Sequence, residues 1–285
     1  MLYLDKPQLK MFKKTRFSKE NSEIFDDIIK YLYPKRKKNQ LLMMKDEHIL
    51  LFLLLHTVMN KNTILYVSKN AFESSEKVIH YLKCEVRIFL KLEEIIEEKV
   101  KIILIDSLLD NYLEEEKFNH LFKKWPELYV VCFDYNRVFS YDTYNYDNNM
   151  FIDYDNLIFI NKLHSNKEAY PYIVSNYQLI SYLETMLEDL NCSMEIDFFI
   201  SVDTHLEYVK YFKNIIYRNY VYLQKYLTKL NISYDDLKYG CYLTIYIRHD
   251  KLLEKQIYAI KIDDKVKIDL RLPLSQIKEF IYRLK

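Results

Sequence analysis

The sequence predicts an α/β protein in which an N-terminal, mainly parallel sheet flanked by helices precedes a C-terminal α+β unit with an antiparallel meander. Three observations support this fold class. Over the first 140 residues, apolar strands alternate with helical segments of about 10 to 15 residues, the pattern of βαβ units. Three of these strands contain the runs ILYV, IILI and YVVC, which are apolar on both faces, as in strands covered on both sides. Near the C-terminus, polar and apolar residues alternate at period 2, which is typical of half-buried antiparallel strands.

The N-terminal elements follow from local periodicity and from the residues that stop it. Apolar residues recur at helical spacing over 22–33, and Pro34 ends that pattern before the basic run at 35–38. A short apolar segment at 40–44 then leads into a helix at 46–59. The later elements are, in order, a strand at 63–68, a helix at 71–83, a strand at 85–90, a helix at 92–99, a strand at 101–106, a helix at 113–124 and a strand at 128–134.

Residues 135–156 interrupt this alternation with a stretch rich in Tyr, Asp and Asn, which favours a domain edge or a long surface loop. We therefore expect a domain at 1–140, a connection at 141–156 and a second domain at 157–285. The second domain is predicted to contain strands at 157–160, 196–202, 242–248, 256–262 and 265–270 and helices at 172–190, 205–230 and 276–284. Gly240, the single glycine, precedes the meander, where a turn requires φ > 0.

The composition excludes several classes of protein. Half of the 285 residues are hydrophobic, which is far too apolar for a disordered chain. A single glycine disfavours nucleotide enzymes, because phosphate loops and dinucleotide fingerprints need glycine. The net charge of +1 provides no global field for nucleic acid or an anionic membrane, so such binding has to be local. The most apolar run, Ile49 to Met59, is much shorter than the ~20 residues of a membrane-spanning helix.

The spacing of cysteine and histidine predicts no metal site and no disulfide, and we expect no cofactor. The four cysteines, Cys84, Cys132, Cys192 and Cys241, are far apart, and all but Cys192 lie in apolar runs, which favours reduced core thiols. The seven histidines are scattered without the spacing of a zinc motif. Because the sequence shows no N-terminal signal pattern, we expect an intracellular, cytoplasmic protein.

The order of elements over residues 25–140 resembles the first RecA-like lobe of superfamily 2 helicases and related ATPases. In that family a first strand leads into a Gly-rich phosphate loop, and a later strand ends in an Asp-Glu pair. Here residues 40–44 stand for the first strand, Met44-Lys45-Asp46-Glu47-His48 for the phosphate loop, Ser68-Lys69-Asn70 for a Ser/Pro-Asn turn and Ile105-Asp106-Ser107 for the acidic pair. Because the segment 44–48 has no glycine and no Lys-Ser/Thr pair, the resemblance implies a lobe that has lost ATP hydrolysis.

Local clusters supply the candidate site residues. The basic residues Lys10, Lys13, Lys14, Arg16, Lys35, Arg36, Lys37 and Lys38 are interleaved with aromatic rings, which predicts nucleic-acid binding, with a solvated arm as the alternative. Asp106 and Asp134 end buried strands, where α/β proteins bind metals or ligands, although Asp106 could instead cap the next turn. On the long helix, Tyr208, Tyr211, Tyr222 and Tyr226 favour a protein interface, with core packing as the alternative.

These observations lead to three hypotheses about function. The first is a non-catalytic accessory protein, a pseudoenzyme scaffold that acts with protein partners, and with nucleic acid, in replication, transcription or nucleic-acid handling. Three alanines against abundant Lys, Ile, Asn and Tyr indicate AT-rich coding, so we expect a viral, plasmid or AT-rich microbial source. The second hypothesis is a nucleotide-dependent transferase of glycosyltransferase type that uses carboxylates at strand ends. The third is a structural or assembly subunit.

Overall fold

The computed structural model divides the chain into two compact units. It describes residues 2–4, 21–32, 36–60, 62–96, 100–107, 110, 115–135, 137–139, 154–164, 169–190, 202–237, 240–262 and 265–285. The larger unit comprises Thr15–Tyr135 and Asn145–His205, and the smaller unit comprises Met1–Lys14, Asn136–Tyr144 and Leu206–Lys285. Each unit contains its own β-sheet.

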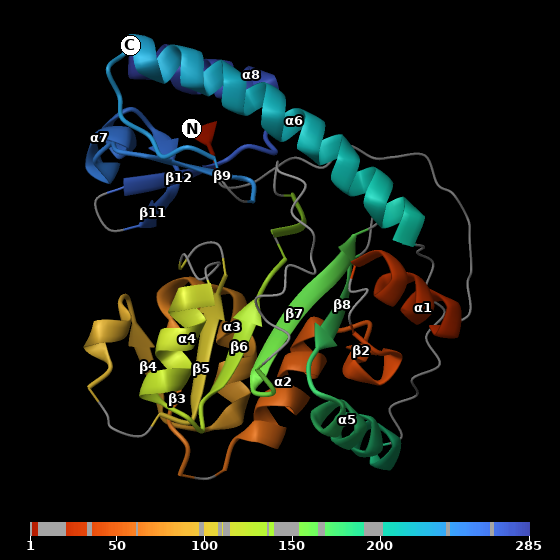
Figure 1. Ribbon diagram of the computed structural model, residues 1–285. Coiled ribbons are helices and arrows are strands. Elements are labelled where there is room, and N and C mark those ends of the chain that lie inside the picture. Colours follow the sequence, from red (N-terminus) through yellow and green to blue (C-terminus); the bar gives the residue numbers. More distant parts are fainter. Residues whose placement is uncertain are drawn as a thin grey trace. The chain divides into compact units, whose positions relative to one another are not determined.

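A seven-stranded sheet forms the centre of the larger unit (Figure 1). Its strands are β2 (Leu41–Met43), β3 (Leu65–Ser68), β4 (Val86–Phe89), β5 (Ile102–Asp106), β6 (Tyr129–Phe133), β7 (Leu157–His164) and β8 (Ala169–Val174). They lie in the order β2-β8-β7-β6-β5-β3-β4. Strand β8 pairs antiparallel with β2 and β7, and the remaining pairs are parallel. The six strands other than β8 therefore end at the same edge of the sheet, which we call the carboxyl edge.

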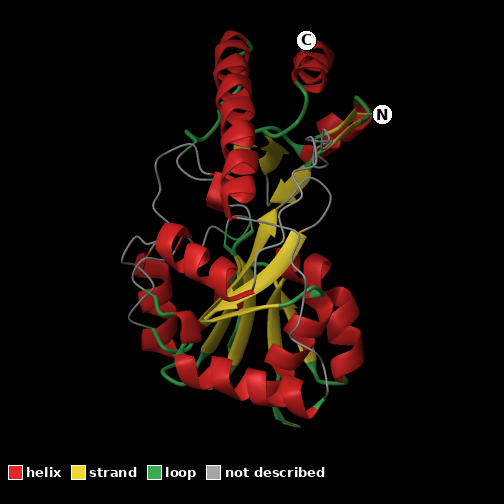
Figure 2. Ribbon diagram, turned by 90° about the vertical axis from the view of Figure 1, so that its right-hand side faces the viewer, coloured by secondary structure: helices red, strands yellow, loops and turns green. Residues whose placement is uncertain are grey.

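Helices cover both faces of this sheet (Figure 2). Three helices, α2 (Glu47–Val58), α3 (Lys69–Leu82) and α5 (Tyr177–Asp189), pack on one face, and α4 (Glu115–Lys124) packs on the other. A further helix, α1 (Asn21–Leu32), buries Ile24 and Ile28. Side chains of β5, β6 and β7 alternate between the two apolar cores, which explains why the runs 102–105, 129–133 and 157–160 are apolar at every position.

Side-chain caps begin three of the helices. Asp46 caps α2, Ser68 caps α3 and Asn176 caps α5, each by accepting a backbone N–H of the first turn. At α2 the Asp46 carboxylate accepts two N–H groups, from His48 at 2.7 Å and from Ile49 at 3.1 Å. Such a cap stabilises a helix by about 1 kcal/mol, because N–H groups of the first turn have no partner within the helix.

The smaller unit combines helices with a three-stranded antiparallel sheet of order β11-β12-β9. Its elements are β1 (Leu2–Tyr3), α6 (Val202–Lys229, from Leu206 on), β9 (Tyr242–Ile245), α7 (His249–Glu254), β10 (Ile257–Tyr258), β11 (Ile260–Ile262), β12 (Lys265–Asp269) and α8 (Leu274–Leu284). Strand β1 pairs in parallel with β10. Asn219 of α6 donates to the backbone oxygens of Leu270 and Leu272 at 2.8 and 2.7 Å, which ties this helix to the chain after β12.

Several sequence predictions are confirmed at this level. The protein is α/β, with a mostly parallel helix-covered sheet and a small antiparallel sheet. Gly240 has a φ of 72°, as its turn requires. Cys132 and Cys241 are buried thiols and Cys84 is a half-buried one, whereas Cys192 lies outside the described residues. In the part of the chain that the structure describes, no helix combines the length and apolarity needed to cross a bilayer.

Other predicted elements differ from the structure. The helix predicted at 172–190 begins only at Tyr177, because Ala169–Val174 is held as β8 between β2 and β7. At the predicted helix 92–99 the described residues form only a 3-10 turn, Leu92–Glu94. Of the strand predicted at 196–202, only Val202 is described, and it begins α6. The proposed domain boundaries stay a prediction, since residues 141–153 of the connection are not described.

Candidate functional site

Polar side chains replace apolar ones where the central strands reach the carboxyl edge. Ser107 directly follows β5 and Asp134 directly follows β6, whereas Asn161 and Lys162 lie within β7. The ladder continues through these positions, because the N–H of Ser107 donates to the oxygen of Phe133 and the N–H of Asp134 donates to that of Ile160, both at 2.9 Å. Open α/β sheets bind their ligands at this edge.

Ser107, Asp134 and Asn161 form what we call the buried cluster. The Ser107 hydroxyl donates to Oδ1 of Asp134 at 2.7 Å, and the Asn161 amide donates to Oδ2 at 3.4 Å. All three residues are at most 2% exposed. Donors on both sides of the carboxylate offset its burial, so this cluster holds β5, β6 and β7 together at the edge.

Glu47, Tyr135 and Lys162 form what we call the charged cluster. Glu47, in the first turn of α2, accepts a hydrogen bond from the Tyr135 hydroxyl and forms an ion pair with Nζ of Lys162. The Lys162 ammonium also lies 4.0 Å from the centre of the Tyr135 ring, a cation–π distance. The Lys162 and Glu47 side chains are 21% and 20% exposed, so both are mostly buried but remain in contact with solvent. This cluster presents a primary amine at the carboxyl edge.

The two clusters project from opposite faces of the sheet. Side chains alternate along a strand, and Cys132 and Phe159 belong to the core under α4, as do Asp134 and Asn161 by parity. Phe133 and Ile160 belong to the core under α2, α3 and α5, and Tyr135 packs against that same core. Lys162 shares the parity of Ile160 and therefore meets Glu47 of α2.

Carboxylates also lie at two helix N-termini at this edge. Asp46 caps α2, as described above. At α3 the capping hydroxyl of Ser68 itself donates to Asp110, whose other oxygen accepts from the Asn70 amide at 2.7 Å. The backbone N–H of Asp106 donates to the same Asp110 carboxylate at 2.7 Å, which ties the end of β5 to the start of α3.

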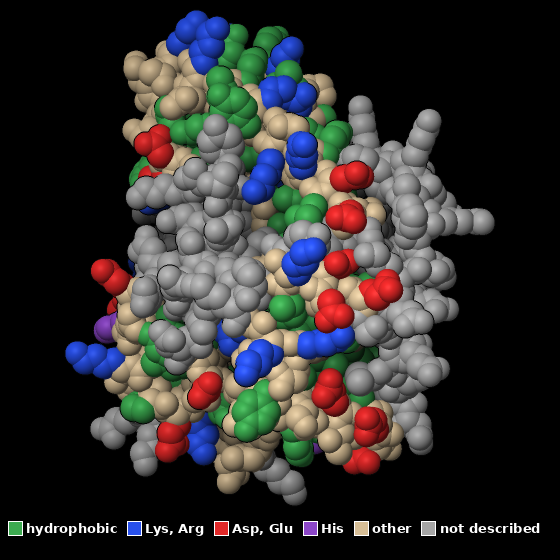
Figure 3. Space-filling model, turned by 45° about the vertical axis from the view of Figure 1, so that its right-hand side comes forward, with side chains coloured by type: hydrophobic (Ala, Val, Ile, Leu, Met, Phe, Trp, Pro, Cys, Tyr) green, Lys and Arg blue, Asp and Glu red, His purple; other side chains and the backbone are tan. Residues whose placement is uncertain are grey.

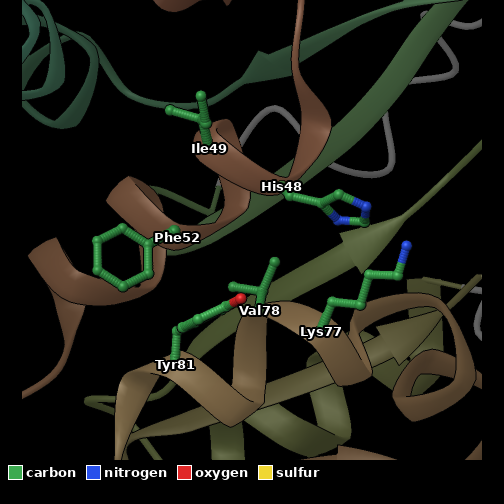
Figure 4. Close-up of a pocket in the computed structure, with 6 residues that line it drawn as sticks. All are labelled: His48, Ile49, Phe52, Lys77, Val78 and Tyr81. Atoms are coloured by element: carbon green, nitrogen blue, oxygen red, sulfur yellow. The ribbon is translucent and has the colours of Figure 1, made fainter.

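A groove of about 570 Å³ lies between α2 and α3 (Figure 4). Its lining consists of His48, Ile49 and Phe52 from α2 and Lys77, Val78 and Tyr81 from α3. The basic groups of His48 and Lys77 gather at one end, and the rings of Phe52 and Tyr81 at the other. Lys77 therefore offers a second, more exposed amine in the larger unit, against which the reactivity of Lys162 can be judged.

The structure places the predicted site residues in different surroundings. Asp106 and Asp134 are 6% and 0% exposed at the carboxyl edge, and Asp134 belongs to the buried cluster. Among the described residues no group of three or more His, Cys, Asp or Glu side chains is arranged to hold a metal ion. Lys10, Lys13, Lys14, Arg16 and Lys35 lie outside the described residues.

The remaining basic candidates lie before β2. Arg36 is half-buried, Lys37 is exposed, and Lys38 pairs with Asp26 of α1 at 3.0 Å. On the face drawn in Figure 3, the coloured Lys and Arg side chains lie singly or in pairs, and Asp and Glu gather toward one side. These positions do not test the predicted binding by the basic residues.

The four tyrosines of α6 are not equivalent. Tyr208 is 6% exposed and packs on Phe212, with ring centres 4.9 Å apart. Burial raises the pKa of Tyr208 to about 12. Tyr211, Tyr222 and Tyr226 are half-buried, so the prediction of an interface remains open for these three.

Sequence reasoning missed the charged cluster, although a signal for part of it was present. The polar pair Asn161-Lys162 interrupts the apolar strand run LIFI, and such an interruption in a buried strand marks its exposed end. Glu47 was noted only as part of the segment 44–48. Its contact with Lys162 joins positions 115 residues apart, which no local pattern indicates.

Comparison with solved structures identifies the architecture. An aromatic aminotransferase from Pyrococcus horikoshii OT3 superposes with a TM-score of 0.70 at 12% identity, over 94% of this chain and 87% of that one. A Methanococcus jannaschii protein with an active site similar to those of kynurenine aminotransferases gives 0.69 at 13% identity, over 99% and 90%. The aspartate aminotransferase of Thermotoga maritima gives 0.65 at 14% identity, over 93% and 81%. No protein-family model and no curated protein matches the sequence.

These comparisons correct the predictions about family and function. The resemblance to a RecA-like lobe is wrong, because the similar structures are aminotransferases and because β2, taken as that lobe's first strand, is an edge strand paired to antiparallel β8. The non-catalytic viral accessory role and the nucleic-acid-binding description drawn from that resemblance are contradicted too, since the similar structures are catalytic transferases. The same structures give no support to the alternatives of a glycosyltransferase-like enzyme and an assembly subunit. The chain has the fold of the aminotransferases.

Proposed function

We propose that this protein is an enzyme of amine–carbonyl chemistry, the class to which amino-group transfer belongs, with Lys162 as its reactive amine. The observation that carries the proposal is the position of Lys162 at the carboxyl edge, held between the Glu47 carboxylate and the Tyr135 ring. A partly buried lysine amine at such an edge is a group that enzymes use to form a Schiff base with a carbonyl compound. The aminotransferase fold supports the same class of chemistry.

The charged cluster suits this reaction because it keeps its charge balance. The Lys162 nitrogen bonds to the carbonyl carbon, the carbonyl oxygen leaves as water, and the ammonium is replaced by a protonated Schiff base of equal charge. Glu47 therefore pairs with a cation before and after the condensation. The Tyr135 hydroxyl, which donates to Glu47, orients that carboxylate toward Lys162.

Pyridoxal phosphate is the cofactor of amino-group transfer, and it is held by a lysine Schiff base with an Asp or Arg at its ring nitrogen. The described residues do not fit this group. Asp134 is 0% exposed and its carboxylate already accepts hydrogen bonds from Ser107 and Asn161, so it is not open to a ring nitrogen. The N–H groups that a phosphate would use at the start of α2 already donate to Asp46. The proposed chemistry therefore concerns a carbonyl compound that condenses directly with Lys162.

Trapping of the Schiff base tests the proposal. The full chain is incubated with pyridoxal as an aldehyde probe, reduced with sodium borohydride and digested for mass spectrometry. We expect the label on the peptide that contains Lys162, at about ten times the level found on Lys77, because the Glu47 carboxylate beside Lys162 stabilises the protonated Schiff base.

Two matched variants accompany this measurement. Lys162→Arg keeps the positive charge beside Glu47 and abolishes the label at that site, whereas Lys77→Arg, in the groove between α2 and α3, leaves the Lys162 label unchanged. Circular dichroism confirms that both variants are folded. Equal labelling of Lys77 and Lys162 in the wild-type protein would contradict the proposal.

A further inference from the structure

We infer that the carboxyl edge of the larger unit rejects phosphorylated ligands, so that the carbonyl compound reaching Lys162 is one without a phosphate group. The inference rests on the proposed function for the identity of the ligand, but the rejection of phosphate is a property of the edge itself. Asp46 is its main determinant, and Asp110 extends it to the neighbouring helix.

Helix N-termini are the usual phosphate sites of α/β proteins, because free N–H groups and the helix dipole favour an anion there. Both helices whose described N-termini follow a strand at the carboxyl edge, α2 after β2 and α3 after β3, are candidates for this role. At each of them a short loop or none at all separates strand and helix, so an anion bound there would lie beside the strand ends. Their first turns therefore decide whether phosphate binds.

At α2 the first turn is occupied. The Asp46 carboxylate accepts the N–H of His48 at 2.7 Å and that of Ile49 at 3.1 Å, which are the donors that a phosphate oxygen would need. The next residue, Glu47, adds a second negative charge that the Lys162 ion pair balances. An incoming phosphate would have to displace one carboxylate and lie beside another.

At α3 the first turn is occupied in a different way. The Ser68 hydroxyl accepts the N–H of Ala71 at 3.1 Å and donates a hydrogen bond to Asp110. Asp110 also accepts from Asn70 and from the backbone of Asp106, each at 2.7 Å, so several donors hold it in place. This helix end therefore carries a built-in anion as well.

The inference has a direct consequence for substrate choice. The Asp46 and Asp110 carboxylates repel a doubly charged phosphate group at both helix ends, whereas they do not repel a neutral aldehyde or ketone. Asp46→Ser should open α2, because serine caps a helix nearly as well as aspartate but carries no charge. The helix then keeps its cap while the anion barrier is removed.

The experiment compares pyridoxal with pyridoxal 5′-phosphate as borohydride-trapped probes of Lys162, at equal concentration. In the wild-type protein we expect pyridoxal to label Lys162 about tenfold more than its phosphate ester does. In Asp46→Ser we expect this preference to fall to about one. Glu85→Gln removes a carboxylate before β4, at the opposite edge of the sheet, and should leave the preference unchanged. Wild-type labelling by the phosphate ester that equals or exceeds labelling by pyridoxal overturns the inference.

A second measurement separates this inference from the proposed function. Inorganic phosphate is titrated against the full chain, and the shift in melting temperature is recorded. No shift in the wild-type protein and a positive shift in Asp46→Ser or in Asp46→Ser with Asp110→Asn support the inference, even if neither aldehyde labels Lys162. A positive shift in the wild-type protein, or none in either variant, overturns it. If neither aldehyde labels Lys162, the proposed function is contradicted, but the inference about phosphate is not.

Discussion

The buried and charged clusters lie at the same sheet edge and are built from adjacent residues, yet they differ in the face they occupy, in solvent exposure and in the charge of their donors. Asp134 and Asn161 precede Tyr135 and Lys162 by one position each, and that single step turns them to the opposite face. The buried cluster has one carboxylate satisfied by neutral donors and closed to solvent. The charged cluster has an amine and a carboxylate that remain one-fifth exposed. The buried cluster, which is closed to solvent, is suited to a structural role. The charged cluster, which a ligand can reach from solvent, is suited to a reactive one.

The largest effect should come from removal of the carboxylate of the buried cluster. Asp134→Ala leaves the Ser107 hydroxyl and the Asn161 amide without their acceptor and opens a cavity, so the free energy of unfolding should fall by about 3 to 4 kcal/mol. Urea denaturation measures this loss. Asp134→Asn keeps the shape and one acceptor oxygen and should cost about half as much. If Asp134→Ala lowered the free energy of unfolding by less than Glu47→Gln does, the buried cluster would not be the more important of the two for stability.

Acid titration tests whether burial alone makes a polar group costly. Burial lowers the pKa of His205 to about 4 from its ordinary 6.5, while its Nδ1 accepts the backbone N–H of His164 at 3.0 Å. Between pH 4 and pH 6.5, His205 therefore binds a proton in the unfolded chain but stays neutral in the folded protein. Stability is full above pH 6.5, and about 2 to 3 kcal/mol should be lost by pH 4.5. In His205→Asn, whose amide oxygen can accept the same N–H, urea midpoints should vary correspondingly less across this range.

The charged cluster should contribute less to stability than the buried one. Glu47→Gln leaves the Lys162 ammonium without its carboxylate, but water still reaches that group, so the loss should be about 1 kcal/mol. The same variant should reduce pyridoxal labelling of Lys162, because the protonated Schiff base loses its counter-ion. A stability loss without any change in labelling would identify the ion pair as purely structural. Urea denaturation and borohydride trapping on the same preparations separate these results.

A more exposed ion pair provides the lower end of the scale. Lys38 and Asp26 lie 3.0 Å apart with side chains 44% and 66% exposed. Asp26→Asn should change the free energy of unfolding by less than about 0.5 kcal/mol, because solvent screens both charges. Added salt should abolish even this difference. An effect as large as that of Glu47→Gln would show that burial does not rank the ion pairs of this protein.

Local patterns predicted much of the sheet and little of the site. The strands ending at Ser68, Asp106 and Phe133 were found within two residues at either end, because their apolar runs are bounded by polar residues. Asp134 was singled out for the same reason. In contrast, β8 was taken as part of a helix, because its identity as a strand comes from pairing with β2 and β7 on either side. The Glu47–Lys162 contact escaped prediction because its partners meet only after that pairing brings α2 beside β7.

The sequence by itself determined the α/β class, the apolar strands and the turn at Gly240, since each of these depends on neighbours along the chain. Tertiary structure alone decided the strand order, the antiparallel insertion of β8 and the division of the edge into two clusters. Those features depend on which strands pair, and pairing brings together residues that are distant in the chain. The sequence suggested an ATPase-like lobe because strand and helix order is shared by many α/β folds, whereas the order of strands within the sheet distinguishes them.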